Sequence, residues 1–381
     1  MMVQRFLAWC DTAGASERAA GVTLLAEAWT SGQIASADRA LAESVLILSL
    51  DDPSPKVRKA LAGALAHSAE APRALILALL ADTTEIAAYV ARCSPLLEDD
   101  ELLELATAGE PRMQAAVAAR SHVGRSIAAA LVEHASRDAC AILLRNRGAV
   151  LTRATSRRLA ERFGSDPEIR SQLASRDDLP ADVRQALIVE VSNALAAHPL
   201  VRATLGAGRA ERVAFDSCER ATAQLAASIE HTETAALVEH LRASGQLSTA
   251  FLLRAVCAGN IDLFAAALAA LGRVSERRLQ SVLVDGREAA FTALVASCGL
   301  PRSAAPLFLA AVQLWREVAR GRLSIDPSEM PQRVMERVVR NAGRSGIAGQ
   351  AEFDGAMALL RRLSAEGARD LVRERAWRLA A

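Results

Sequence analysis

The sequence lacks almost every pattern that would point to β-strands or membrane segments. Aromatic residues make up only 3% of its 381 residues, with a single tyrosine. Alternating runs of Val, Ile, Thr and Tyr, which are typical of strands, are absent. No stretch approaches the roughly 18 consecutive apolar residues that would predict a membrane span. Because Ala and Leu, both strong helix formers, fill most apolar positions, we expect an all-helical protein.

Cysteine is present but without the spacing of a disulfide framework or a metal site. No C-x-x-C pair occurs among the six cysteines, which stand in apolar helical patterns. Such residues are usually small core side chains, so we expect no metal and no cofactor. Free thiols also suit a reducing cytoplasm, where we expect this protein. The six are Cys10, Cys93, Cys140, Cys218, Cys257 and Cys298.

Lysine is nearly missing, and neither positive nor negative charge is in excess. Lys56 and Lys59 are the only lysines, and 45 basic residues face 44 acidic ones for a net charge of +1. This balance predicts no general attraction to nucleic acid or to an anionic membrane surface. Catalytic motifs are also incomplete: "LGAGRAE" lacks the third glycine and the preceding strand of a dinucleotide-binding loop. We therefore expect a protein that is not an enzyme.

What the sequence does contain is internal repetition. In its N-terminal half, an apolar pair, then Arg or Asn, then a helix-breaking residue recurs in "YVARCSP", "VAARSHV", "LLRNRGA" and "LASRDDLP". The marked residues Arg92, Arg120, Asn146 and Arg176 lie 28, 26 and 30 apart, room for two helices each. A helix pair of this size cannot bury its apolar face alone, so neighbouring pairs must stack. The repeat predicts an α-solenoid with a period of about 25–30 residues.

A second repeat lies in the C-terminal half. "GNIDLFAAALAALGRVSERRL" and "GREAAFTALVASCGLPRSAAPL" align at a spacing of 27. The glycines coincide in pairs, Gly259 with Gly286 and Gly272 with Gly299. Each glycine is predicted to end a helix in a backbone conformation of positive φ, which glycine adopts readily.

Two stretches of the chain resemble HEAT repeats. "DDPSPKVRKAL" carries Asp52 and Pro53 followed by Val57 and Arg58, and "DDLPADVRQAL" repeats the pattern. Together with "VARCSPLLEDDELL", "AVAARSHV" and "LLRNRGAVLT", they resemble the bacterial family called domain of unknown function 2336, from about residue 40 to beyond 300. The resemblance implies a solenoid of HEAT-like repeats in which a turn Asp pairs with an Arg of a stacked helix. It implies no established activity.

The period breaks between the halves. "AAHPLVRATLGAGRAERV" carries Pro199, Gly206 and Gly208, which are typical of a hinge or an irregular repeat. We therefore expect an N-terminal helical cap over 1–45, a HEAT-like repeat block over 46–197, an irregular hinge over 198–215, a second helical repeat block over 216–314 and a C-terminal helical tail over 315–381.

The first candidate site is the set of repeated arginines. Arg92, Arg120 and Arg176 occupy equivalent repeat positions and should line one edge of the solenoid. One interpretation is that they satisfy helix C-terminal carbonyls or neighbouring acids. The other is a groove that holds an acidic peptide or another anion through guanidinium hydrogen bonds.

A stripe of arginines near the C-terminus is the second candidate. Arg333, Arg337, Arg340 and Arg344 are spaced by 4, 3 and 4, which places them on one helical face. The stripe is interpreted either as a solvated outer face or as a face that binds an anion or a partner.

These observations favour a non-catalytic scaffold that binds a partner protein, with a regulatory or signalling role suggested by architecture alone. One alternative is a HEAT-like DNA glycosylase or another nucleic-acid-binding protein. Such a protein needs a basic concave surface and aromatic contacts, whereas the four tryptophans lie near the two ends of this chain. A second alternative is an anion- or nucleotide-sensing module that uses the C-terminal arginine stripe.

Overall fold

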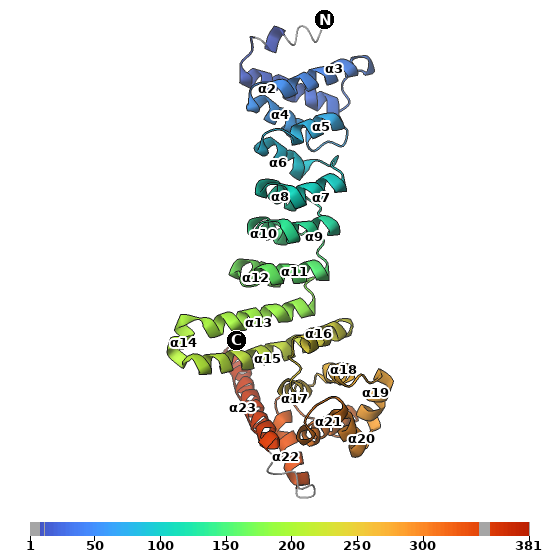
Figure 1. Ribbon diagram of the computed structural model, residues 1–381, viewed down its shortest axis with the longest axis vertical. Coiled ribbons are helices and arrows are strands. Elements are labelled where there is room, and N and C mark those ends of the chain that lie inside the picture. The colour runs from blue at the N-terminus through green and yellow to red at the C-terminus, as the bar shows by residue number, and fades with distance from the viewer. Residues whose placement is uncertain (1–7, 11, 343–350, 381) are drawn as a thin grey trace. The chain divides into compact units, whose positions relative to one another are not determined.

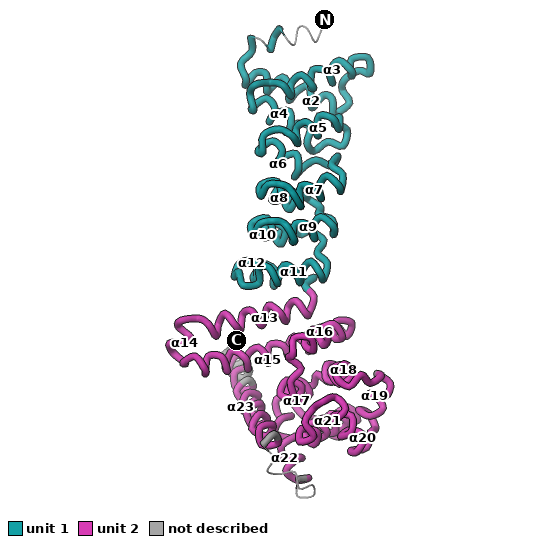
Figure 2. The backbone as a smooth tube through the Cα atoms, viewed as in Figure 1, with its two compact units in different colours: residues 1–179 teal, residues 180–381 magenta. Residues whose placement is uncertain are grey.

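A computed structural model describes residues 8–10, 12–342 and 351–380 (Figure 1). No β-strand occurs in these residues, and an isolated β-bridge joins Val123 to Ala149. The prediction of an all-helical protein is confirmed. The chain divides into two compact units, residues 1–179 and residues 180–381 (Figure 2).

The first unit is a series of short helices. In chain order they are α2 (Ala15–Thr30), α3 (Ser36–Leu48), the 3-10 turn η1 (Ser49–Asp51), α4 (Pro55–Leu65), α5 (Arg73–Leu80), α6 (Thr84–Cys93), α7 (Asp99–Ala108), α8 (Pro111–Ala118), α9 (Arg125–His134), α10 (Arg137–Arg145), α11 (Arg153–Phe163) and α12 (Pro167–Ala174).

Alternate helices of this unit pack on one another. Each of α2, α4, α6, α8 and α10 contacts the next even-numbered helix, and α7, α9 and α11 do the same among themselves (Figure 1). Within α4, Val57, Leu61 and Leu65 are all buried. Their spacing of four places them on one side of the helix. Short helices with a single apolar stripe thus bury it against the helices before and after them.

Loops of the first unit are also joined to one another. The Val123 amide donates to the carbonyl of Gly148 at 3.1 Å, and the Val150 amide donates to the carbonyl of Val123 at 3.0 Å. A Cβ at Gly148 would lie 1.9 Å from the carbonyl oxygen of Ser121. Glycine is therefore required where the loop before α11 meets the loop before α9.

The second unit contains longer helices. They are α13 (Ala181–Ala197), α14 (Pro199–Leu205), α15 (Ala207–Ser228), α16 (His231–Ala243), α17 (Thr249–Cys257), α18 (Ile261–Gly272), α19 (Glu276–Asp285), α20 (Glu288–Ser297), the 3-10 turn η2 (Arg302–Ala304), α21 (Ala305–Ala319), α22 (Met330–Ala342) and α23 (Ala351–Ala380).

The segment 198–215, where the sequence predicts a hinge, lies inside the second unit and is mostly helical. Pro199 occupies the first turn of α14, where a missing amide hydrogen costs nothing. Gly206 then has a φ of +79° and separates α14 from α15. These residues turn the chain between α13 and α15, whereas the two units divide at residues 179 and 180. Hinge motion in this segment stays a prediction.

Helix α17 is surrounded by other helices of the second unit. All its residues from 251 to 257 are buried, and it contacts α15, α18, α21 and α23. The rings of Phe264 and Phe308 pack nearby with centroids 5.2 Å apart. A helix that is buried on all sides lies inside a core rather than in a row. Here the packing differs from the linear stacking that the sequence predicts.

The prediction of positive φ at the repeated glycines is confirmed at two positions and wrong at two. Gly259 and Gly299 have φ values of +87° and +71°. Gly286 ends α19 with a φ of −63°. Gly272 remains helical, because the next residue, Arg273, takes the left-handed conformation with a φ of +49°.

Candidate functional site

The repeated residues of the first unit form hydrogen bonds to the end of a neighbouring helix. Arg120 follows α8, and its guanidinium donates to the carbonyl oxygens of Ala91 at 2.5 Å and Ser94 at 2.8 Å, where α6 ends. Asn146 follows α10, and its amide donates to Ala118 at 2.9 Å and to Arg120 at 2.6 Å, where α8 ends. Each of these residues therefore caps the helix one repeat earlier.

Arg176 continues the series at the end of α12. Its guanidinium donates to the carbonyls of Leu144 at 3.3 Å, Ala149 at 3.4 Å and Asn146 at 3.5 Å. Asp178 accepts two further bonds from Arg176 at 2.8 Å each. We refer to Arg120, Asn146 and Arg176 as the capping ladder. Of the two interpretations of the repeated arginines, these contacts match the one in which they satisfy helix carbonyls.

Arg92 does not share this arrangement. Helix α6 continues to Cys93, so Arg92 lies within its last turn, whereas Arg120 and Arg176 come after their helices have ended. The Arg92 side chain is exposed and its guanidinium carbon lies 5.6 Å from the centre of the Tyr89 ring. The three predicted arginines are consequently not equivalent, because Arg92 lies one residue before the end of its helix, whereas Arg120 and Arg176 lie two residues after theirs.

Aspartate–arginine pairs link further helices of the first unit. Arg18 of α2 donates to both carboxylate oxygens of Asp52 at 2.7 and 2.9 Å. Arg58 of α4 donates in the same way to Asp82 at 2.6 and 3.0 Å. The guanidinium hydrogen bonds lower the pKa of Asp52 and of Asp82. Within the HEAT-like motif, Asp52 thus pairs with the preceding helix pair and Arg58 with the following one.

The C-terminal arginine stripe is partly engaged in the fold. Arg337 of α22 donates to both carboxylate oxygens of Glu317 of α21 at 2.9 Å, which lowers the pKa of that glutamate. Arg333 and Arg340 are exposed. Arg344 lies outside the described residues. The stripe therefore contributes one arginine to the packing of α22 on α21 and two to the surface.

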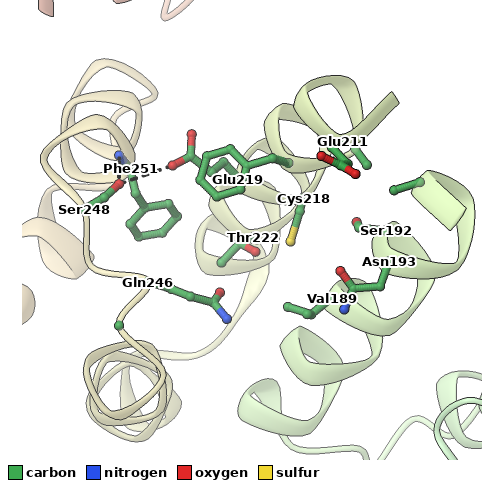
Figure 3. Close-up of a pocket in the computed structure, with 14 residues that line it drawn as sticks. Val189, Ser192, Asn193, Glu211, Cys218, Glu219, Thr222, Gln246, Ser248 and Phe251 are labelled. Carbon is green, nitrogen blue, oxygen red and sulfur yellow. Dashed lines mark hydrogen bonds between the residues drawn. The ribbon is translucent and has the colours of Figure 1, made fainter. Parts of the chain in front are cut away.

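A cavity of about 340 Å³ opens between α13, α15 and α17 (Figure 3). Helix α13 contributes Ser192, helix α15 contributes Cys218, Glu219 and Thr222, and Ser248 comes from the start of α17. The spacing of 218, 219 and 222 places these three side chains on one face of α15. The wall is mixed, since Val189, Phe215 and Phe251 add apolar surface to these polar groups.

Glu219 is the most unusual group in this wall. It is 7% exposed, and its Oε1 accepts from the Ser248 hydroxyl at 3.3 Å. Its Oε2 is buried and forms no hydrogen bond with any described residue. Burial raises the pKa of Glu219, although the positive charge of Arg254, 4.0 Å away, opposes the shift. The carboxyl therefore holds a proton more readily than an ordinary glutamate.

Large apolar side chains are exposed on α13, α14 and α15, the segment that supplies two walls of this cavity. They come from the end of α13, from α14 and from the first half of α15, and Phe215 among them also lines the cavity. Phe215 is 60% exposed and Leu200 is 71% exposed. We refer to this set as the apolar face. Its members are Val191, Leu195, Leu200, Leu205, Val213 and Phe215.

Sequence reasoning did not find this cavity. It interprets Cys218 as a core residue, and the structure places that side chain half-buried in the cavity wall. One usable signal is that Glu219 stands three residues before Thr222 and four before Ala223, so an acid shares the buried face of α15. No sequence signal ties Ser248 to Glu219, because the two are 29 residues apart and meet only through tertiary packing.

Within the described ranges, no group of three or more His, Cys, Asp or Glu side chains is placed to hold a metal ion. All six cysteines are free thiols. None of the helices in the described part of the chain is both long and apolar enough to cross a membrane.

Comparison with known proteins gives one match. A family model described as an uncharacterised protein conserved in bacteria (DUF2336) matches residues 86–348, which is more than half of the chain. No curated protein and no solved structure matches the chain.

Proposed function

The chain belongs to the DUF2336 family of uncharacterised bacterial proteins, and from this premise we propose that it is a non-catalytic scaffold that binds a partner protein. In this proposal the first unit is an α-solenoid of HEAT-like repeats. Support for the solenoid comes from the contacts between alternate helices, from the capping ladder and from the Arg18–Asp52 and Arg58–Asp82 pairs. The second unit carries the binding surface.

The observation that carries the proposal is the apolar face. Six large apolar side chains are exposed within residues 191–215, and one of them, Phe215, lines the first cavity. Large exposed apolar side chains that gather in one segment are unfavourable in water and are typical of interaction sites. Burial by a partner would stabilise the complex by about 25 cal/mol for each Å² removed from water. Phe215, an exposed aromatic ring beside a cavity, is the expected centre of the interface.

The repeated arginines are less suited to hold an acidic peptide than the sequence suggests. Arg120 and Arg176 already donate to backbone carbonyls. An acidic ligand would have to break those bonds and leave the carbonyls of α6 and α10 without donors, at a cost of about 1–3 kcal/mol for each buried group. Arg92, which is exposed, has no such cost. We therefore propose the apolar face as the partner site.

The test compares Phe215→Asp with Leu24→Asp in the full-length protein, expressed in its native bacterium and captured for quantitative mass spectrometry. Leu24 lies on α2 and is 68% exposed, so it is a matched control for adding a charge to exposed apolar surface. A specific partner should be lost with Phe215→Asp and kept with Leu24→Asp. If the two variants and the unmodified protein recover the same proteins, the apolar face is not the partner site.

Light scattering provides a second measurement of the same variants. If the purified protein is a dimer that Phe215→Asp dissociates, the apolar face binds a second copy and the proposal of a separate partner protein fails. A monomer that is unchanged by either substitution is the expected result.

A further inference from the structure

A second cavity of the same unit is lined by arginines. It has a volume of about 520 Å³ and lies between α15 and α23. Four lining residues of α15 (209, 213, 216 and 220) and four of α23 (362, 366, 369 and 373) are each spaced by 4, 3 and 4, and Ser217 and Ala365 line the cavity beside them. This spacing gives one face on each helix. Five of these residues are arginines, namely Arg209, Arg220, Arg362, Arg369 and Arg373.

The two carboxylates of the cavity are already paired. Asp216 accepts from Arg362 at 3.0 Å. Glu366 accepts from Arg254 at 2.7 Å, and Arg254 is a buried residue of α17 that does not line this cavity. The acids therefore neutralise two arginines, of which only one belongs to the lining.

The remaining arginines give the cavity an excess of positive charge. Arg209, Arg220 and Arg369 form no ion pair with any carboxylate in the described part of the chain. Like charges held on facing helices repel one another, and an anion between them removes that repulsion. Because the chain as a whole has a net charge of only +1, this concentration is local.

We propose that this cavity binds a small molecule carrying two or more phosphoryl groups. Guanidinium groups match phosphate oxygens with pairs of parallel hydrogen bonds. Each face runs over 11 residue steps, about 16 Å of helix, which suits a chain of phosphoryl groups better than a single one. The described lining has no aromatic side chain, so recognition falls on the phosphoryl groups rather than on a base. Val213 of the apolar face also lines this cavity, whereas Phe215 does not, and the cavity shares no residue with the C-terminal arginine stripe.

The experiment is isothermal titration of the full-length protein with inorganic tripolyphosphate and with ATP, at 50 and 150 mM NaCl (about 14 and 8 Å of screening length). The lining variant is Arg209→Gln with Arg369→Gln. Its matched control is Arg212→Gln with Arg361→Gln, which removes the same charge from exposed positions of the same two helices. The lining variant should weaken tripolyphosphate binding about tenfold or more, and the control should change it less than about twofold.

Comparing the two ligands identifies the source of the phosphoryl groups. Equal affinity assigns the site to a phosphoryl chain alone, and tighter ATP binding assigns it to a nucleotide. Absence of binding by both ligands, or equal weakening by the lining and control variants, overturns the proposal. A duplex oligonucleotide is the third ligand. If it binds more tightly than tripolyphosphate, and if the lining and control variants weaken that binding equally, the proposal is also overturned, because the arginines then belong to a nucleic-acid-binding surface.

A conservative variant distinguishes the loss of a ligand contact from the loss of folding. Arg369→Lys keeps the positive charge but removes the planar fork, so it should weaken tripolyphosphate binding while the circular dichroism spectrum and the thermal midpoint are unchanged. Undiminished binding by this variant and by the lining variant would contradict a role for Arg369.

Discussion

Arginine in this chain often serves as a donor to the ends of helices. Arg120 and Arg176 of the first unit donate to backbone carbonyls, and Arg316 of the second unit donates to Val282 and Leu283 at 2.8 and 2.6 Å. A guanidinium can reach two carbonyls at once in a fixed geometry, which an ammonium group does less well. Burial lowers the pKa of Arg120 and of Arg316, so these side chains act as structural donors.

Arg120→Ala should therefore destabilise the protein far more than Arg92→Ala. Removing the Arg120 guanidinium leaves the carbonyls of Ala91 and Ser94 without this donor and should cost about 2–3 kcal/mol. Arg92 is exposed, and its removal should change stability by less than about 0.5 kcal/mol. Urea denaturation of both variants measures the difference. Equal losses of unfolding free energy in the two variants would mean that the hydrogen bonds of Arg120 add no stability beyond that of an exposed arginine.

Glu219→Gln should change how stability depends on pH. The pKa of Glu219 is raised in the folded protein, so the stability it contributes is fully present below its unfolded pKa of about 4.3 and is lost as pH rises through the folded pKa. Glutamine resembles the protonated acid and titrates nowhere in this range. Between pH 4 and pH 8 the unmodified protein should lose unfolding free energy that the variant keeps. The variant should therefore become more stable relative to the unmodified protein as the pH rises. A constant difference would contradict the raised pKa.

The sequence predicts helix pairs well where their spacing repeats. Arg120, Asn146 and Arg176 each stand where a helix ends, because the break that follows an apolar helix is a local signal. Arg92 was misplaced, since the pattern does not reveal that α6 extends to Cys93. The pattern also gives no indication that α17 is enclosed on all sides.

The two cavities could not be predicted from the sequence. Their walls combine helices that are distant in the chain: α13 with α15 and α17, and α15 with α23. The matching 4-3-4 spacing on α15 and α23 is legible in the sequence, but nothing there indicates that these two faces meet. Hydrophobic periodicity predicts which side of a helix is buried, but it does not predict which other helix packs against that side.

Two glycine substitutions should have opposite effects. Gly148→Ala places a Cβ 1.9 Å from the carbonyl oxygen of Ser121 and should cost about 2–4 kcal/mol by forcing the two loops apart. Gly63→Ala, within α4, meets nothing within 4 Å and should stabilise the protein by about 0.5–1 kcal/mol. Thermal denaturation of both variants checks the signs. A neutral Gly148→Ala would show that the loop contact yields without cost.

The two compact units should fold separately. Residues 1–179 and 180–381 each contain their own buried core. We expect fragments cut at this boundary to be helical by circular dichroism and to unfold cooperatively. The sum of their spectra should reproduce that of the intact chain. A fragment that is unfolded alone would show that its unit depends on the other.

The capping ladder has a consequence for the length of the first unit. Arg120, Asn146 and Arg176 each reach back by a single repeat and no further. If one internal helix pair were removed or duplicated, each remaining residue of the capping ladder would still find a backbone carbonyl acceptor in the preceding repeat. Gene duplication could thus lengthen or shorten this unit in steps of one helix pair, with stability growing as a sum over adjacent helix pairs.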